Sequence, residues 1–310
     1  MPRITEKPPP SRPSNQLRRK YLACLGAWPK AAPLRIETLE RSEHDGYVRE
    51  KLRFQTLPGA WVPAYLLIPH RLKSPAAALL CLHQHAGQFE LGKSEAVGRI
   101  GSAHANYALR FAREGFVTFA FDARCFEERR TYWDGDGIER DKQSMLGTSL
   151  AKLMLWDIKR ALDVMATRPE IDARRIGAVG HSMGGFEVGM AMGLEPRISC
   201  GVISCGMRTY EGTFRRGERV PAIHYVPGLY AHMDLPEVYG LAAPRPLLVM
   251  AGKRDTTCKY EDFQAAAPVL KKAYAQARAK QKLDLFAEDV PHTFSETMYA
   301  RATRWFRKWV

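Results

Sequence analysis

Short apolar runs alternate with helical stretches along the chain from residue 76 onward. The apolar runs lack polar alternation and lie at 76–83, 116–122, 175–182, 198–205 and 245–252. Such runs are typical of strands buried on both faces of a parallel sheet. Apolar residues recur at helical spacing at 104–115, 149–169, 183–193 and 295–310, and a last strand is expected at 282–288. The alternation predicts a mostly parallel central sheet of about eight strands with helices on both faces.

The first part of the chain has a different pattern. Residues 1–13 are rich in proline and are expected to be disordered or extended. A short helix is expected at 15–27. The segments 47–54 and 61–69 flank a Pro-Gly turn, and they predict a pair of antiparallel strands.

Two irregular insertions, 124–147 and 207–240, each follow the C-terminal end of a predicted strand. Long loops at that edge of a parallel sheet usually build the ligand site. We therefore expect both insertions near the active site of a catalytic domain at 46–310, preceded by an N-terminal extension or cap at 1–45. The candidate substrate-binding side chains are mostly aromatic or charged: Arg124, Phe126, Glu127, Trp133, Trp156, His224, Tyr225, Tyr230, His232 and Met233. Packing within the structure is the alternative role for each of them, and for Arg124 an ion pair with Glu127 or Glu128.

Charge and composition narrow the choice of partners. The chain has 47 Lys and Arg against 33 Asp and Glu, a net charge of +14, but no arginine-rich stripe or zinc-finger spacing, so no nucleic-acid partner is expected. No apolar run approaches the roughly 18–20 residues of a membrane span. The basic N-terminus lacks the apolar core of a secretory signal, so we expect a cytoplasmic protein without a membrane partner. Six scattered cysteines predict free, largely buried thiols. A homo-oligomer remains open.

The segment Gly180 to Gly184 fits the pattern G-x-S-x-G, with Ser182 at its centre. It stands where a predicted strand meets a predicted helix, which is the context this motif requires. In such a turn the serine adopts strained dihedrals, and the flanking glycines prevent clashes. Ser182 is therefore the candidate nucleophile, and an idle serine in a Gly-rich turn is the alternative.

A serine hydroxyl needs a general base, and in this arrangement an acid and then a histidine follow later in the chain. Asp255 comes directly after the strand at 245–252, and His292 comes between the last strand and the last helix. The order Ser182, Asp255, His292 matches the requirement. Asp289 is the rival acid.

An oxyanion hole is the third component that acyl transfer requires. One N–H group should come from Met183, and the second from the loop after the strand at 76–83. We expect the His85 N–H in this role, with Gln84 as second choice. His83 and His85 also form an HxH pair, but no third ligand stands at metal spacing, so neither a metal nor a cofactor is expected.

These motifs resemble the dienelactone-hydrolase-like and acetyl-xylan-esterase-like branch of the α/β-hydrolases. The matching segments are LCLHQHAGQFELGKSE, FDARCFEERR, WDIKRALDVMATRPEIDARRIGAVGHSMGG and HYVPGLYAHMDLPEVYGLAAPRPLLVMAGKRD. The resemblance covers roughly residues 45 to 310 and implies an α/β-hydrolase fold that cleaves carboxylic esters through an acyl-enzyme. It assigns the nucleophile to Ser182, the acid to Asp255 and the base to His292. The chain departs from the branch at His83-Gln84, where HG is common, and at Val290-Pro291, where a glycine usually precedes the histidine.

Three classes of function remain after this reasoning. The first is a serine hydrolase of a small or medium ester or lactone. The second uses the same three residues for thioester, amide or carbon–carbon cleavage, or for acyl transfer. The third is a non-catalytic binding protein, which would not need all three residues. A haloalkane dehalogenase is disfavoured because the motif carries a serine instead of an aspartate.

Overall fold

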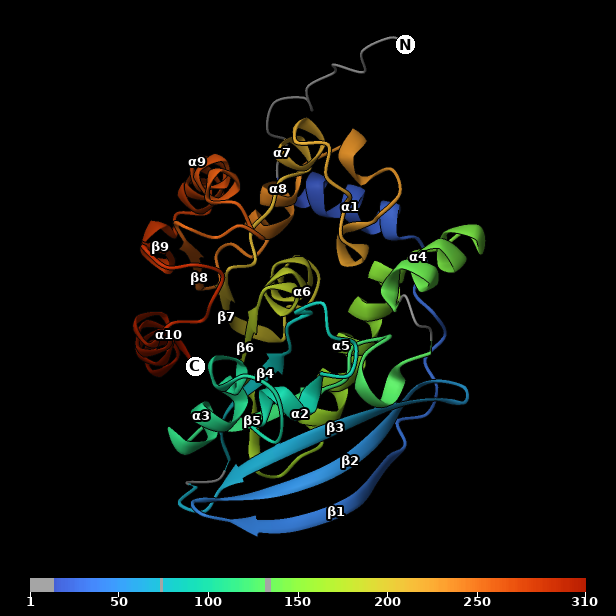
Figure 1. Cartoon of the computed structure of the whole chain (residues 1–310), viewed down its shortest axis with the longest axis vertical. Coiled ribbons are helices and arrows are strands. Elements are labelled where there is room, and N and C mark those ends of the chain that lie inside the picture. The colour runs from blue at the N-terminus through green and yellow to red at the C-terminus, as the bar shows by residue number, and fades with distance from the viewer. Residues whose placement is uncertain (1–13, 73–74, 132–134) are drawn as a thin grey trace.

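The computed structural model describes residues 14–72, 75–131 and 135–310. Its centre is a nine-stranded sheet in the order β1-β2-β3-β5-β4-β6-β7-β8-β9 (Figure 1). The strands are β1 (Ile36–His44), β2 (Tyr47–Leu57), β3 (Ala60–Pro69), β4 (Ala76–Leu82), β5 (Val117–Phe121), β6 (Ile171–His181), β7 (Ile198–Ser204), β8 (Leu247–Gly252) and β9 (Leu283–Glu288). The six strands β4 to β9 are mutually parallel. The pairs β1–β2, β2–β3 and β3–β5 are antiparallel. The predicted mostly parallel sheet is therefore confirmed.

The sheet has one strand more than the expected number of about eight, because β1 adds an edge strand. No strand was expected there, because IETLERSEH is charged and has no apolar run, and every side chain in it is exposed or half-buried. β1 pairs with β2 from Ile36↔Phe54 to His44↔Tyr47. The expected domain boundary at residue 45 thus falls between two paired strands, and residues 36–44 of the expected extension belong to the sheet.

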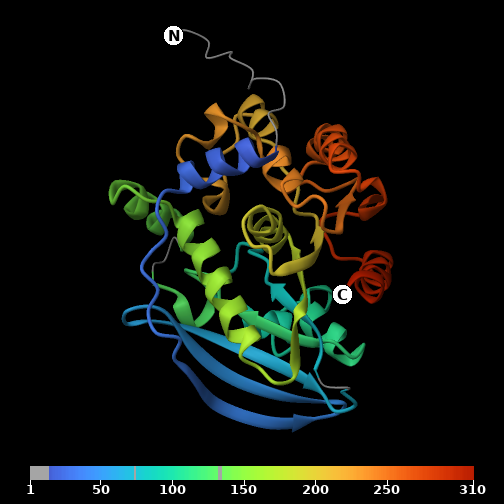
Figure 2. The same ribbon diagram turned by 180° about the vertical axis from the view of Figure 1, so that it is seen from behind.

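Helices cover both faces of the sheet, as expected (Figures 1 and 2). The α-helices are α1 (Ser14–Leu25), α2 (Lys93–Ala96), α3 (Tyr107–Arg113), α4 (Asp136–Met145), α5 (Leu150–Ala166), α6 (Met183–Met192), α7 (Tyr210–Arg215), α8 (Leu235–Gly240), α9 (Tyr260–Gln276) and α10 (Glu296–Trp309). Single 3-10 turns lie at η1 (Ala103–Ala105), η2 (Glu127–Arg129), η3 (Ala222–His224), η4 (Leu229–Ala231) and η5 (Lys280–Lys282). α9, which contains Pro268, was not expected from the sequence.

Two apolar cores hold the helices to the sheet. The larger one joins one face to residues of α1, α5, α6, α8 and α9, and the smaller one joins the other face to α3 and α10. Every side chain of β4 is buried, which agrees with its unbroken apolar sequence. Local caps set where helices begin: Ser149 Oγ accepts from Lys152 N at α5, and Ser295 Oγ accepts from Met298 N at α10.

The two insertions are partly helical and lie on the side of the sheet where the strands end. The first contains η2 and α4, and the second contains α7, η3, η4 and α8. α1 lies beside α7 and α8 (Figures 1 and 2), where Arg18 Nη2 donates to Leu241 O at 2.8 Å. Within the described residues, no helix has the length and apolar character that crossing a bilayer requires.

Candidate active site

Ser182 stands at the sharp turn between β6 and α6. Its backbone dihedrals, φ 55° and ψ −119°, lie in a region that residues other than glycine rarely adopt. Backbone contacts maintain this conformation: Ser182 N donates to Ser204 O at 2.9 Å, and Phe186 N donates to Ser182 O at 3.0 Å. The strain that the motif predicts is therefore present at this serine.

Two glycines allow the turn to close against the sheet. A Cβ at Gly184 would overlap the carbonyl of Leu82 on β4, and a Cβ at Gly180 would overlap the backbone of Gly184. Both overlaps are with backbone atoms, which cannot rotate away. The glycines on either side of Ser182 are thus required by close approach of α6 to the strand ends.

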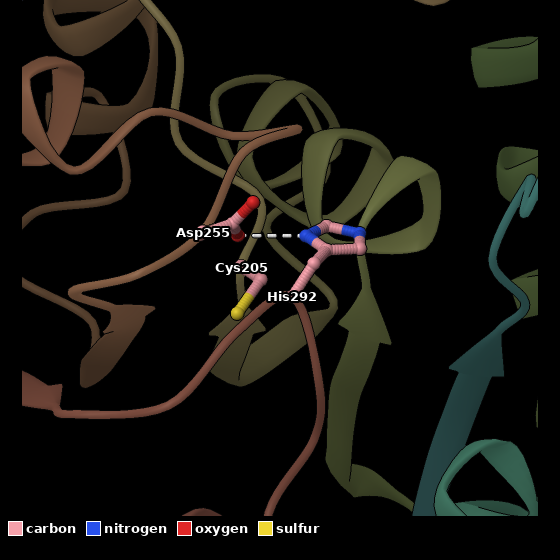
Figure 3. Close-up of side chains that lie close together, drawn as sticks. All are labelled: Cys205, Asp255 and His292. Atoms are coloured by element: carbon pink, nitrogen blue, oxygen red, sulfur yellow. Dashed lines mark hydrogen bonds and ion pairs between the residues drawn. The ribbon is translucent and has the colours of Figure 1, made fainter.

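Asp255 and His292 come from the loops after β8 and β9, and they meet in a direct hydrogen bond (Figure 3). His292 Nδ1 lies 2.7 Å from Asp255 Oδ2. The other carboxylate oxygen, Oδ1, accepts from Thr257 N and Cys258 N, each at 2.8 Å. Three hydrogen bonds therefore fix the carboxylate, and the carboxylate in turn fixes the tautomer with hydrogen on His292 Nδ1.

The environment keeps Asp255 ionised although its side chain is buried. Burial by itself raises the pKa of a carboxyl group, but the bond to His292 and the two N–H donors hold the pKa of Asp255 below its ordinary value. The rival acid, Asp289, is exposed and pairs with Arg254 Nε at 3.1 Å. The described structure therefore places Asp255, and not Asp289, beside His292.

Ser182 and His292 line one cavity of about 870 Å³. Within the described chain no hydrogen bond joins Ser182 Oγ to His292. Such bonds are often long or misaligned without substrate and tighten when it binds. The cavity wall combines apolar and polar side chains: Gln84, His85, Gln88, Glu95, Ser102, His104, Asp136, Met183, Phe186, Arg208, Ile223 and Thr257. No described residue of 14–45 belongs to this wall.

Both candidate oxyanion donors lie at this cavity. Met183 is the first residue of α6, and His85 belongs to the loop after β4. Among the described residues, the N–H groups of Met183, His85 and Gln84 have no acceptor within the protein. The His85 ring is held aside, because Nδ1 accepts from Gly87 N at 2.9 Å and Nε2 lies 3.6 Å from Asp136 Oδ2. The Gln84 side chain is directed to Glu95.

His83 is excluded as a ligand of an HxH metal site by its own hydrogen bonds. Nδ1 donates to Gln84 O at 2.8 Å, and Nε2 accepts from Ala123 N at 3.0 Å. Burial lowers the pKa of His83 to about 4, so the ring is neutral. Its two nitrogens hold the loops after β4 and β5 together.

The first insertion does not supply the expected pocket residues. Arg124 pairs with the buried Asp157 at 3.0 Å, and Phe126 is fully buried against the rings of His83 and His85. Glu127 accepts from Lys93 Nζ at 2.6 Å. Trp133 lies outside the described residues. Trp156 lies beyond this insertion, on α5, and donates to Thr56 O at 3.0 Å from within the core. The four described residues of this group stabilise the structure behind the cavity, so their expected place in its wall is corrected.

The prediction that aromatic residues of the second insertion line the pocket is also corrected. His224 is buried and bonds Tyr239 at 3.0 Å, and Met233 is a core residue. Tyr225 and Tyr230 line a separate cavity of about 250 Å³, and His232 lines neither cavity. The insertion reaches the main cavity through other residues, namely Arg208 and Pro221 to Ile223. Aromatic content indicated the right segment but the wrong side chains, because His224 packs inward and Tyr225 and Tyr230 face a different cavity.

Four residues in or beside the cavity were not expected there from the sequence. Glu95, Ser102 and His104 line the cavity from the segment between β4 and α3, where only the oxyanion candidates Gln84 and His85 had been singled out. His181 precedes the nucleophile, and its ring lies 4.7 Å from that of His292. Burial, and then the charge of His292, lowers the pKa of His181 well below its ordinary value. His181 therefore stays neutral beside the base.

Comparisons with known proteins agree with this fold. A model of the Abhydrolase family matches residues 17–288. The chain is 27% identical over 296 residues to "Putative hydrolase YtaP" of Bacillus subtilis (strain 168), covering 94% of this chain and 98% of that protein. A crystal structure described as a "putative acetyl xylan esterase" from Bacteroides fragilis superposes with a TM-score of 0.73 and 21% identity, over 89% of this chain and 74% of that chain. A glucuronoyl esterase from Solibacter usitatus gives 0.71 and 16%, over 94% and 91%.

Proposed function

The chain belongs to the Abhydrolase family, and from this premise we propose that it is a serine hydrolase that cleaves carboxylic esters or lactones through an acyl-enzyme. One observation supports this most directly. A serine at a strained strand–helix turn and a histidine paired with a buried carboxylate line the same cavity. A binding protein would need neither the strain at Ser182 nor the pair behind it.

In the proposed cycle, Ser182 Oγ attacks the ester carbonyl as His292 Nε2 takes its proton. Asp255 holds the proton on Nδ1 and stabilises the imidazolium that forms. The free N–H groups of Met183 and His85 receive the oxyanion. His292 then protonates the leaving alcohol and afterwards activates a water molecule, which releases the acid and regenerates Ser182.

The cavity guides the choice of substrates. A volume of about 870 Å³ accommodates a small or medium ester. Its polar side chains suit an ester that carries hydroxyl groups, and the structural neighbours named above are described as a putative acetyl xylan esterase and a glucuronoyl esterase. Acetylated sugars and sugar uronate esters are therefore the first substrates to compare with simple alkyl esters.

The test compares turnover of p-nitrophenyl acetate and labelling by a fluorophosphonate in the wild type, Ser182→Ala and Ser102→Ala. Ser102 is the matched control, because it lines the same cavity. We expect a single adduct on wild type and Ser102→Ala, none on Ser182→Ala, and a loss of turnover on the order of 10⁶ in Ser182→Ala only. An adduct that persists in Ser182→Ala, or a folded wild type without adduct and turnover, would refute the proposal.

A further inference from the structure

Cys205 lies against the Asp255–His292 pair without a role in the proposed cycle. It follows the end of β7, where its backbone has a positive φ of 45°. Its Sγ, a carboxylate oxygen of Asp255 and a ring nitrogen of His292 all lie within 4.8 Å of one another (Figure 3). The thiol donates to Thr293 O at 3.4 Å, the carbonyl that directly follows His292. Three donor atoms of three kinds therefore converge from three loops at the strand ends.

This set of donors matches the preferences of one class of ion. Imidazole nitrogen, thiolate sulfur and carboxylate oxygen are the protein ligands of zinc, at about 2.0–2.3 Å from the metal. Magnesium and calcium prefer sites made of oxygen alone. The charges also fit, because a divalent ion balances one carboxylate and one thiolate inside a buried site.

We propose that Cys205, Asp255 and His292 form an inhibitory site for thiophilic divalent cations of the zinc type. The proposal rests on the roles given above to Asp255 and His292. In the metal-free protein, His292 carries its proton on Nδ1, and the Cys205 thiol keeps its proton in a hydrogen bond to Thr293 O. Coordination releases the thiol proton to solvent and moves the Nδ1 proton to Nε2. A protonated Nε2 cannot accept the proton of Ser182, so catalysis stops.

The three side chains must move apart before a metal ion can bind between them. Cys205 and the Asp255 carboxylate are buried, whereas the His292 side chain is 20% exposed and lines the cavity. An ion can therefore enter only from the cavity, past the imidazole. The 2.7 Å separation of Nδ1 and Oδ2 must widen slightly, because two ligands of one zinc ion lie more than 3 Å apart. Entry is accordingly expected to be slow compared with substrate turnover.

A second cluster of possible metal ligands in the described chain already contains a positive charge. The carboxylates of Asp122, Glu127 and Glu128 also lie within 4.8 Å of one another. The ammonium group of Lys93 stands among them, at 2.8, 2.6 and 2.7 Å. That cluster has its own cation. No Lys or Arg forms an ion pair with Asp255 in the described structure.

The first experiment measures inhibition by zinc in the wild type, Cys205→Ala and Cys200→Ala, each relative to its own uninhibited rate. Cys200 is the matched control, because it is a buried thiol on β7, the strand that Cys205 directly follows. We expect slow inhibition that a chelator reverses, and no inhibition by magnesium. The zinc concentration for half inhibition should rise at least about tenfold in Cys205→Ala and stay unchanged in Cys200→Ala. Equal sensitivity of Cys205→Ala and wild type would overturn the proposal.

The second experiment separates this proposal from the proposed function. Binding of cadmium is followed by the ultraviolet charge-transfer band of a cadmium-bound thiolate in Ser182→Ala, which needs no turnover. We expect the band in Ser182→Ala and its loss in the double variant Ser182→Ala/Cys205→Ala, while Ser182→Ala/Cys200→Ala retains it. A band of equal strength in all three proteins would place the ion on another cysteine and refute the site, whatever reaction the enzyme catalyses.

Discussion

Replacement of Asp255 by Asn tests how the charge and orientation of this side chain act on His292. The variant keeps the size of the side chain and removes its charge. One oxygen must still receive Thr257 N and Cys258 N, because turning the amide around would set its NH₂ group against two N–H donors. Each donor left unpaired would cost about 1–3 kcal/mol. The amide NH₂ therefore faces His292 Nδ1 and forces the ring proton to Nε2.

That tautomer cannot take the proton of Ser182, so the expected loss in kcat is about 10⁴, the value typical of such an exchange in a Ser–His–Asp triad. It corresponds to about 5.5 kcal/mol of transition-state stabilisation. KM should change little, because Asp255 is buried behind His292. The assay is steady-state hydrolysis of p-nitrophenyl acetate, with a melting curve to show that the variant is folded.

The matched control is Asp289→Asn, the neighbouring carboxylate on the same side of the sheet. In the described structure Asp289 is 74% exposed and pairs only with Arg254, which is itself exposed. Exposed pairs contribute little, so kcat should stay within about twofold of wild type. A folded Asp255→Asn protein that retains more than about a tenth of the activity, or an equal loss in Asp289→Asn, would show that the reasoning from this hydrogen bond is wrong.

Three further predictions concern stability. Lys93→Met leaves the buried carboxylate of Asp122 and the half-buried carboxylate of Glu127 without their cation, and it should lower the free energy of unfolding in urea by about 3–5 kcal/mol. Lys51→Met, which removes only a pair with the partly exposed Glu128, should cost less than about 1 kcal/mol, and equal losses in the two variants would contradict this expectation. Gly184→Ala should yield little folded protein, because its Cβ would overlap the Leu82 carbonyl; normal expression and melting would show that the turn can relax. Burial raises the pKa of Glu187 to about 8, so its ionisation opposes folding as the pH rises toward that value. Glu187→Gln should therefore gain more in melting temperature over wild type at about pH 9 than at about pH 6, and a gain that does not depend on pH would exclude this cause.

The strands, most long helices and the three proposed catalytic residues were predictable because their signals are local. Ser182 is marked by glycines that the close approach to Leu82 requires, and these are adjacent in the chain. Asp255 and His292 each come directly after a strand, and parallel strands bring their C-terminal ends to one edge. The apolar runs that identify those strands thus also place the two residues near each other. β1 was not predicted, because an exposed edge strand needs no apolar pattern.

The wall of the cavity depends on contacts between segments that are far apart, and only the tertiary structure decides them. Nothing local distinguishes Arg208, which reaches the cavity, from Arg124, which the buried Asp157 holds away from it. Nor does sequence spacing place Cys205 beside His292, 87 positions later, whereas packing of the loops after β7, β8 and β9 does. The sequence by itself therefore determined the fold and the candidate chemistry, because these follow from short-range sterics and from the order of strands. The shape and lining of the pocket depend on which side chains form contacts with buried residues elsewhere in the chain. Those contacts exist only in the packed tertiary structure.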